Sequence, residues 1–244
     1  MMLWQEYSEK LRYAMDAILG TQTEAMSRAA SLVRDTIERD GLIYIFGCGH
    51  SHILAEECFY RAGGLACTVP IFHEPLMLHE SASLSSRLEK QSGLADRVLS
   101  RYNIVERDML ICISTSDKNA VPVELCGAVG EKGVPTVGVS SSAYFADEVH
   151  NALGKHLHEV CSVWIDNAAP HGDACLTLRG AAVPMTPVST VTGAFILNSI
   201  LAQGAQLALD DGAEVPIYLS GNIPGGAEYN RKLIERYAPR IASL

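Results

Sequence analysis

Short apolar runs alternate with amphipathic stretches along most of this chain. The apolar runs cover Leu42–Phe46, Ala66–Phe72, Met109–Ser114, Thr136–Val139 and Cys161–Ile165. Such runs, rich in β-branched residues, are typical of parallel strands that are buried on both faces. Helical patterns separate them, so the sequence predicts an α/β fold with a doubly wound, largely parallel sheet of five strands and right-handed crossovers.

Two helices are expected ahead of the first strand. Leu3, Tyr7, Leu11, Ala14 and Ile18 recur at steps of three and four, which indicates one face of an amphipathic helix that ends near Gly20. A second helix is predicted from about Thr23 to Arg39. We therefore expect residues 1–40 to form a helical pair and residues 41–244 to form the ligand-binding domain, within one globular unit overall.

The later helices follow from the same spacing. They are predicted at about 51–62, 94–102, 119–132, 146–159, 187–209 and 227–237, with a polar segment at 73–90.

Composition narrows the function classes. A net charge of −9 and a pI near 5.3 oppose a general role in nucleic-acid binding, because no basic stripe is present. No apolar run approaches membrane-spanning length and the N-terminus does not resemble a leader, so we expect no membrane partner and a cytoplasmic protein. The seven cysteines form no CxxC pair, which favours reduced core residues.

Two loops that follow predicted strands carry the candidate chemistry. Gly47–His52 follows the first strand, and Ser114–Asn119 follows the third. Backbone N–H groups that open a helix at a strand's carboxyl end point outward, and Ser and Thr hydroxyls add donors. Since ligands of doubly wound folds bind at this edge, the two loops together predict a phosphate site.

Other ligands fit these residues less well. A dinucleotide fingerprint would need a third glycine at position 52, where His52 stands, and Glu74 is a poor match for its acidic residue. His50 and His52 have the spacing of a metal pair, but the sequence fixes no third ligand. We therefore expect neither a metal nor a cofactor.

The loop residues resemble those of the sugar isomerase (SIS) domain family. Gly47-Cys48-Gly49-His50-Ser51-His52 and the following Ala55-Glu56-Glu57 are similar to a segment of phosphoheptose isomerase, a member of that family, and Ile113-Ser114-Thr115-Ser116-Asp117-Lys118-Asn119 is similar to its Ile-Ser-Thr-Ser-Gly-Asn-Ser motif. Lys132-Gly133-Val134-Pro135 also fits, so the likeness covers about residues 25–140. Residues 159–173 look more like a phosphosugar-binding branch near N-acetylmuramic acid 6-phosphate etherase.

The resemblance implies a flavodoxin-like sheet that binds a phosphorylated sugar. The phosphosugar-binding residues would be Gly49, His50, Ser51, Ser114, Thr115, Ser116 and Asn119. The chain departs from the isomerase pattern at Ile53, where that family has a metal-binding histidine, and in its last long helix, which has no histidine. The pattern therefore does not predict zinc-dependent heptose isomerisation.

Each candidate also has an ordinary structural interpretation. The serines could cap helices, which would satisfy free N–H groups. Glu57 is a candidate base for removing a proton beside a carbonyl, although it could instead pair with Arg61 four residues on. His79 and Glu80 suit proton transfer at neutral pH, as do His73 and Glu74, but all could be plain loop residues.

Three further groups of residues are less specific. His156 and His158 are expected at a solvated helix end, facing different sides. Asp166, His171 and Asp173 follow the fifth strand and could line the pocket or shape turns. Ser189 and Thr190 are expected to cap the long helix.

Taken together, these features predict a phosphosugar isomerase or a related lyase. Glu57, then Glu80, would act as base, and His79 would assist at the sugar oxygens. The alternative is a phosphosugar sensor without catalysis. The apolar faces of the first two helices favour a homodimer or homotetramer.

Overall fold

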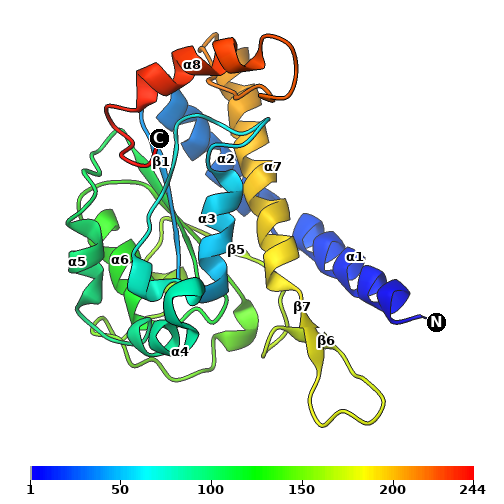
Figure 1. Ribbon diagram of the computed structural model, residues 1–244. Coiled ribbons are helices and arrows are strands. Elements are labelled where there is room, and N and C mark those ends of the chain that lie inside the picture. The colour runs from blue at the N-terminus through cyan, green and yellow to red at the C-terminus, as the bar shows by residue number, and fades with distance from the viewer. Residues whose placement is uncertain (1) are drawn as a thin grey trace.

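A five-stranded parallel sheet forms the centre of the molecule (Figure 1). The structure, a computed structural model, describes residues 2–244. The strands lie in the order β2-β1-β3-β4-β5, which is the flavodoxin-like order. Their bounds are β1 Ile43–Gly47, β2 Thr68–Pro70, β3 Met109–Ile113, β4 Thr136–Ser140 and β5 Val163–Asp166. The predicted fold class is confirmed.

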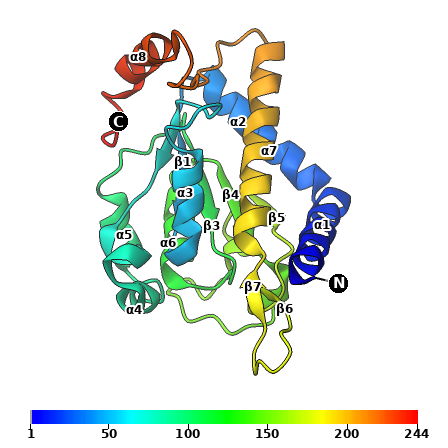
Figure 2. The same ribbon diagram turned by 45° about the vertical axis from the view of Figure 1, so that its right-hand side comes forward.

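The central strands are buried because helices cover both faces of the sheet. Every residue of β1, β3 and β4 is buried, as their unbroken apolar runs predict. On one face α2 (Thr23–Glu38) and α3 (His52–Cys58) contact the strands, and α7 (Ser189–Asp210) packs across both helices. On the other face lie α5 (Leu94–Leu99) and α6 (Ala120–Gly130) (Figure 2).

Close helix contacts depend on small residues of α7. A Cβ placed on Gly193 would lie 2.5 Å from Leu54 of α3, and one on Gly204 would lie 2.5 Å from Val33 of α2. Glycine at these positions lets α7 approach both helices. By length and composition α7 could cross a membrane, but half of its apolar window is buried inside this fold.

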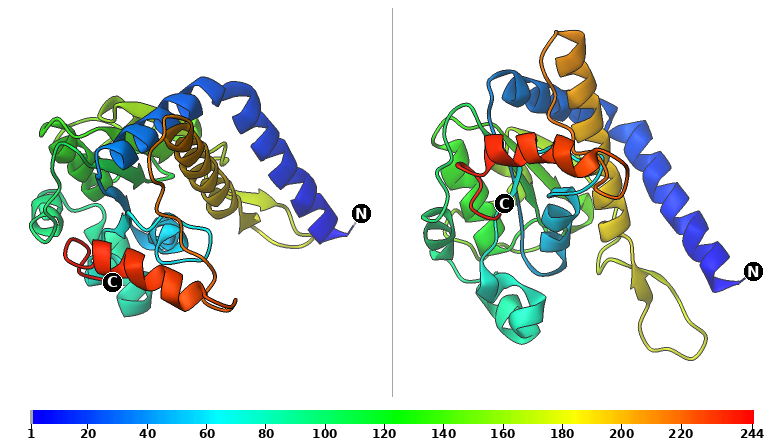
Figure 3. Two further views of the ribbon diagram at one scale, coloured as in Figure 1. Left: turned by 90° about the horizontal axis from the view of Figure 1, so that it is seen from above. Right: turned by 45° about the horizontal axis from the view of Figure 1, so that its top comes forward.

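The remaining elements lie around this core. Helix α1 (Leu3–Thr21) projects from the body beside the hairpin of β6 (Ala174–Leu176) and β7 (Met185–Pro187) (Figure 3). Helix α4 (Leu78–Leu88) lies next to the carboxyl end of β1, and α8 (Gly226–Tyr237) lies near the opposite end of the sheet. Short 3₁₀ turns are η1 Gly49–Ser51, η2 Glu74–Leu76, η3 Ser142–Tyr144 and η4 Leu157–Glu159.

Two predictions about secondary structure were wrong or incomplete. The helix expected at about 146–159 does not form, and most of that segment is irregular apart from η4. The β6–β7 hairpin was not predicted, and the polar segment 73–90 contains α4. The cysteines are all free, as expected, and burial raises the pKa of the Cys67 and Cys161 thiols to about 12.

Candidate functional site

The two predicted loops lie at the same edge of the sheet. β1 and β3 are adjacent and parallel, and Gly47 pairs in register with Ile113, so both loops leave the sheet at the same level. Gly47 makes the first loop tight, because a Cβ there would lie 2.6 Å from the Ser51 carbonyl carbon. The loop therefore turns back at once and brings Ser51 to the end of the strand.

The polar side chains of these loops do not cap their helices. Ser51 is the N-cap residue of α3 and Asn119 is the N-cap residue of α6, yet neither side chain makes a capping hydrogen bond. Asn119 has the extended backbone that an N-cap residue usually adopts. The structural alternative for Ser51 is therefore not realised, and these side chains keep free donors at the sheet edge.

Hydrogen bonds to β4 and to residues just beyond β4 and β5 hold the second loop in place. The Ser114 N–H donates to the Val139 carbonyl at 3.0 Å, and the Thr115 carbonyl accepts from Ser141 N–H at 3.1 Å. The Thr115 hydroxyl accepts from Asn167 Nδ2 at 3.2 Å. These bonds hold the loop without using the hydroxyl groups of Ser114 and Ser116.

Asp117 anchors the second loop in the interior. It is fully buried and has a left-handed φ of 62°, at the position where the resembling motif has glycine. Its carboxylate accepts from Ser140 Oγ at 2.7 Å and from the His158 N–H at 3.1 Å. His158 Nδ1 lies 2.5 Å from Asp117 Oδ2, and His156 Nδ1 lies 3.2 Å from the same oxygen.

This network corrects the prediction for the two histidines. They do not lie at a solvated α-helix end and do not face different sides, because only the short 3₁₀ turn η4 forms there and both rings turn toward Asp117. His158 also stacks on Phe145, with ring centroids 3.8 Å apart. The cluster joins the second loop to the segment before β5.

Asp117, His156 and His158 also form a donor set that could hold a metal ion. Their ligand atoms all lie within 4.8 Å of one another. Two ligands of one tetrahedral zinc ion lie about 3.3 Å apart, given metal–ligand distances of about 2.0 Å. The distance of 2.5 Å between His158 and Asp117 is that of a hydrogen bond, so the present geometry serves the loop as an anchor.

Helix α4 borders the first loop and brings new residues to the site. A Cβ placed on Gly49 would lie 3.9 Å from Leu78, at the start of α4, and 4.0 Å from Oε2 of Glu89, its C-cap residue. Sequence reasoning missed Glu89, because only the packing of α4 brings it beside the loop. Burial raises the pKa of the Glu89 carboxyl, an effect that the charge of Lys90 opposes.

The predicted histidines of this region differ in exposure. His50 is exposed, whereas His52 is buried and its Nδ1 contacts the Gly49 carbonyl oxygen. His79 and Glu80 are both exposed, with His79 Nε2 3.8 Å from Glu80 Oε1. The His79 ring lies 6.2 Å from the His52 ring, which places His79 next to the first loop.

The other predicted acidic residues have partners. Glu57 on α3 forms an ion pair with Arg61, as its structural alternative proposed. Glu74 pairs with Arg101 at 2.9 Å, and a backbone hydrogen bond, with help from Arg101, lowers the pKa of the Glu74 carboxyl. Burial lowers the pKa of the neighbouring His73 imidazole.

The residues after β5 shape turns. Asp166 accepts from Ser142 Oγ at 2.5 Å and from the Ala168 N–H at 2.9 Å. Asp173, at a φ of 62°, accepts from Ser189 N–H and Oγ and so holds the start of α7. His171 stacks on Tyr144, with ring centroids 4.5 Å apart.

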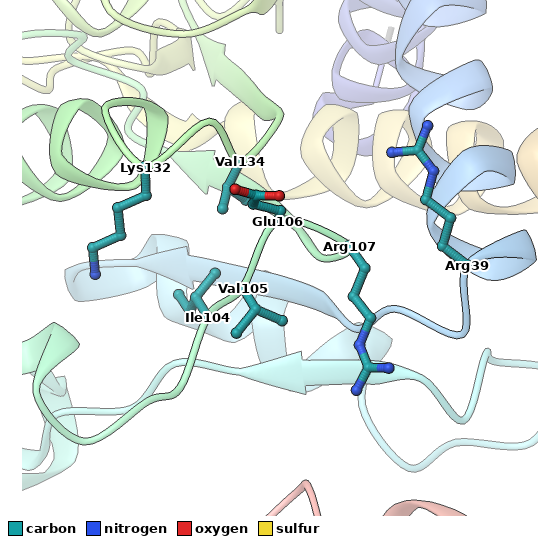
Figure 4. Close-up of a pocket in the computed structure, with 7 residues that line it drawn as sticks. All are labelled: Arg39, Ile104, Val105, Glu106, Arg107, Lys132 and Val134. Carbon is teal, nitrogen blue, oxygen red and sulfur yellow. The ribbon is translucent and has the colours of Figure 1, made fainter.

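Two cavities lie at opposite edges of the sheet. One of about 180 Å³ adjoins the second loop and is lined by Lys90, Lys118, Asn119, Ala120, Glu148 and His150. Lys118 is paired with Asp147 at 2.6 Å. The other, of about 660 Å³, lies where the chain enters β3 and β4, away from both loops (Figure 4). Its cationic side chains, Arg39, Arg107 and Lys132, point in different directions rather than toward one centre.

Comparison with known proteins agrees with this geometry. The model of the SIS domain family matches residues 6–141, which include both loops. The chain belongs to the SIS domain family. UPF0309 proteins of Geobacillus thermodenitrificans and Brucella anthropi are 42% and 41% identical to it, over 98% of this chain and 96% and 97% of theirs.

Solved structures share the fold at low sequence identity. Phosphoheptose isomerase from Neisseria gonorrhoeae superposes with a TM-score of 0.52 at 15% identity, over 83% of this chain and 97% of that one. The NanR protein of Vibrio vulnificus, complexed with ManNAc-6P, gives a TM-score of 0.51 at 14% identity, over 99% of this chain and 70% of that one. These likenesses confirm the SIS fold.

Proposed function

We propose that this protein binds a phosphorylated sugar at the edge of the sheet where the two loops meet. The phosphate would be held by backbone N–H groups and side chains of Gly49, His50, Ser51, Ser114, Thr115, Ser116 and Asn119. The observation that carries this proposal is that Ser51 and Asn119 stand at helix N-caps without capping them. Donors at a helix start that the protein leaves unused suit an anionic ligand.

Cationic groups near the second loop support the same ligand. Lys90 and Lys118 line the cavity that Asn119 adjoins. Because Lys118 is paired with Asp147 and Glu148 also lines this cavity, Lys90 is the cation that is available to attract a phosphate, on a protein whose net charge is −9. The two structural neighbours named above are a phosphosugar isomerase and a protein crystallised with a sugar phosphate, which agrees with this class of ligand.

We further propose that the bound sugar undergoes isomerisation or a related elimination. A carboxylate would remove a proton from the carbon next to the carbonyl, giving an enediol, and a second group would serve the oxygens. Glu57 is the first candidate for the base and Glu80 the second, with His79 assisting. No metal or other cofactor is part of this proposal.

A sensor is the second candidate function. The likeness to the sugar isomerase domain of the RpiR transcription factor from Sphaerobacter thermophilus favours it, with a TM-score of 0.50 at 14% identity over 98% of this chain and 99% of that one. A sensor and an enzyme would share every phosphate-binding residue, so only turnover distinguishes them. For both candidate functions we propose a cytoplasmic protein. We also propose that it forms a homodimer or homotetramer, because α1 exposes apolar side chains.

A thermal-shift panel tests the proposed ligand class. Fructose 6-phosphate, sedoheptulose 7-phosphate, N-acetylmannosamine 6-phosphate and N-acetylmuramic acid 6-phosphate would each be compared with the unphosphorylated sugar. A ligand at 100 times its Kd adds about 2.7 kcal/mol of stability. We expect at least one phosphorylated sugar to raise the Tm and its unphosphorylated form to leave it unchanged. Equal responses within every pair would contradict phosphate recognition.

A further inference from the structure

Buried acidic side chains in this protein normally have hydrogen-bond donors. Asp108 accepts from the N–H groups of Leu42 and Val105. Glu124 accepts from those of Gly93 and Ala152. Asp117 has Ser140 and His158 as described above. Each of these carboxylates is therefore explained by the backbone or loop that it holds.

Glu89 does not follow this rule. Its side chain is partly buried, and its carboxylate has no hydrogen-bond or ion-pair partner anywhere in residues 2–244. Lys90 is the charged neighbour that opposes the effect of burial. A partly buried carboxylate without a donor loses part of its hydration and gains no hydrogen bond in return, so no contact within the described residues explains its place.

The position of Glu89 connects the two loops. Its Oε2 faces Gly49 of the first loop, at 4.0 Å from a Cβ placed there. Its backbone carbonyl accepts the N–H of Val121 at 3.0 Å, in the first turn of the helix that follows the second loop. The backbone of Glu89 is therefore bonded to the helix that follows the second loop, while its side chain faces the first loop.

We propose that Glu89 is the second acid/base group of this site, and this inference rests on the proposed isomerase function. In the forward step Glu57 takes the proton from the carbon beside the carbonyl. The C–H electron pair forms the C=C bond of the enediol, and the carbonyl π pair moves to oxygen, which takes a proton from Glu89. In the second half Glu89 recovers a proton from the neighbouring hydroxyl, whose oxygen becomes the new carbonyl, and Glu57 returns its proton to the other carbon.

The environments of the two carboxylates suit these roles. Glu57 forms an ion pair with Arg61 and so offers a carboxylate, the form in which a base acts. Burial raises the pKa of the Glu89 carboxyl, which favours the protonated form that an acid needs. The titratable groups that face Glu89 are Cys48 of the first loop and Lys90.

The test measures exchange in deuterated water with Glu89→Gln and a matched control. Glu131→Gln is that control, since Glu131 is the C-cap of α6 with a φ of −61° and ψ of −21°, close to the −60° and −22° of Glu89, but it is exposed. The probe is whichever of fructose 6-phosphate, sedoheptulose 7-phosphate and N-acetylmannosamine 6-phosphate gives the largest thermal shift.

We expect Glu89→Gln to slow deuterium incorporation by about 10²–10⁴-fold while the Kd stays within a few-fold. The parent rate should fall as the pH rises through the pKa of Glu89, and this fall should disappear in Glu89→Gln. Glu131→Gln should match the parent in rate and pH profile. Glu89→Asp, which keeps an acid, should retain more exchange than Glu89→Gln.

Different failures overturn different claims. If the parent exchanges and Glu89→Gln exchanges equally fast, the role of Glu89 is wrong and the proposed isomerase stands. If the parent binds the probe without any exchange, both the isomerase and the role of Glu89 are wrong. A Glu89→Gln protein that melts well below the parent would show that Glu89 is structural, which also overturns the inference.

Discussion

Asn119 has the extended backbone of an N-cap residue, yet its side chain does not cap α6. Ser51, whose backbone is helical, does not cap α3 either. An N-cap hydrogen bond contributes about 1 kcal/mol, so its absence at the start of α6 is a measurable loss. Residues at binding sites commonly sacrifice such local stability, because their donors must remain available to a ligand. The sequence proposes these residues as site candidates through their resemblance to the SIS motifs, and their role in binding remains a prediction.

Glu57→Gln should lower kcat by about 10²–10⁴-fold with a phosphosugar that the parent turns over. The amide keeps the shape and hydrogen bonding of the side chain but cannot accept the carbon-bound proton. Ligand affinity should stay within a few-fold, which calorimetry would check. Unchanged kcat in Glu57→Gln would remove Glu57 from the mechanism.

The pH dependence of stability should carry the signature of Glu89. Its carboxyl has a raised pKa in the folded protein, so between the ordinary value of 4.5 and that raised value the folded state binds more protons than the unfolded state. The contribution of Glu89 to stability therefore falls as the pH rises through this window. Cys48 and Lys90 are the titratable groups beside it.

Glu89→Gln removes this effect. We expect the variant to melt above the parent at pH 7 and to match it below about pH 4, where both states of the parent are protonated. Melting curves across pH 4 to 8 would measure the difference. A parent that is the more stable of the two at pH 7 would contradict the assignment of Glu89 as an unpartnered, partly buried acid.

At the level of elements, the strands were predictable and the segment after β4 was not. β1 and β3 are apolar and β4 is mostly so, because both faces of these strands are buried, and this signal lies in the strands themselves. The segment 146–159 has a helix-like pattern, but its backbone N–H groups at Ala152 and His158 donate to the side chains of Glu124 and Asp117, which are far away in sequence. Long-range hydrogen bonds of this kind leave no periodic signal.

For the candidate site, the meeting of the two loops was predictable from the sequence and the place of Glu89 was not. Both loops directly follow strands, so their meeting at one edge follows from sheet order. Glu89 stands 40 residues after Gly49, at the end of a helix whose packing no local pattern fixes. Its place beside the first loop required the structure.

Asp117→Ala should destabilise the protein, because it removes the carboxylate that anchors the second loop. It leaves the Ser140 hydroxyl and the His158 N–H without their acceptor, and each buried unpaired donor costs about 1–3 kcal/mol. We expect a loss of about 2–4 kcal/mol in the free energy of unfolding, measured in urea. Asp147→Ala is the control, because its ion pair with Lys118 is near the surface and its loss should cost much less stability. Equal losses in the two variants would contradict the anchoring role.

At the level of the whole molecule, α1 leaves much of its apolar surface uncovered. Of its residues only Ala14 and Ile18 are buried, while Trp4 and Tyr13 are 68% and 77% exposed. Figure 3 shows α1 extending away from the sheet. A second copy of this chain would cover such a projecting apolar helix.

Light scattering at micromolar concentration should therefore give the mass of a dimer or tetramer. Replacing Trp4 and Tyr13 together by glutamate should shift the protein toward the monomer, since the charges would have to be buried in the interface. Glu9→Gln, an exposed polar change on the same helix, should leave the mass unchanged. A monomeric parent would contradict the proposed assembly.

The central claim is that the two loops hold the phosphate of a sugar, and titration calorimetry of a loop variant tests it most directly. The titrant is the phosphosugar with the largest thermal shift, and the variant carries Ser114→Ala with Ser116→Ala. We expect binding to weaken by about 2–4 kcal/mol with little change in Tm. The control carries Ser27→Ala with Ser31→Ala on α2, whose hydroxyls donate to helix carbonyls away from the site, and should bind like the parent. Equal affinity in the loop variant, the control and the parent would contradict the claim.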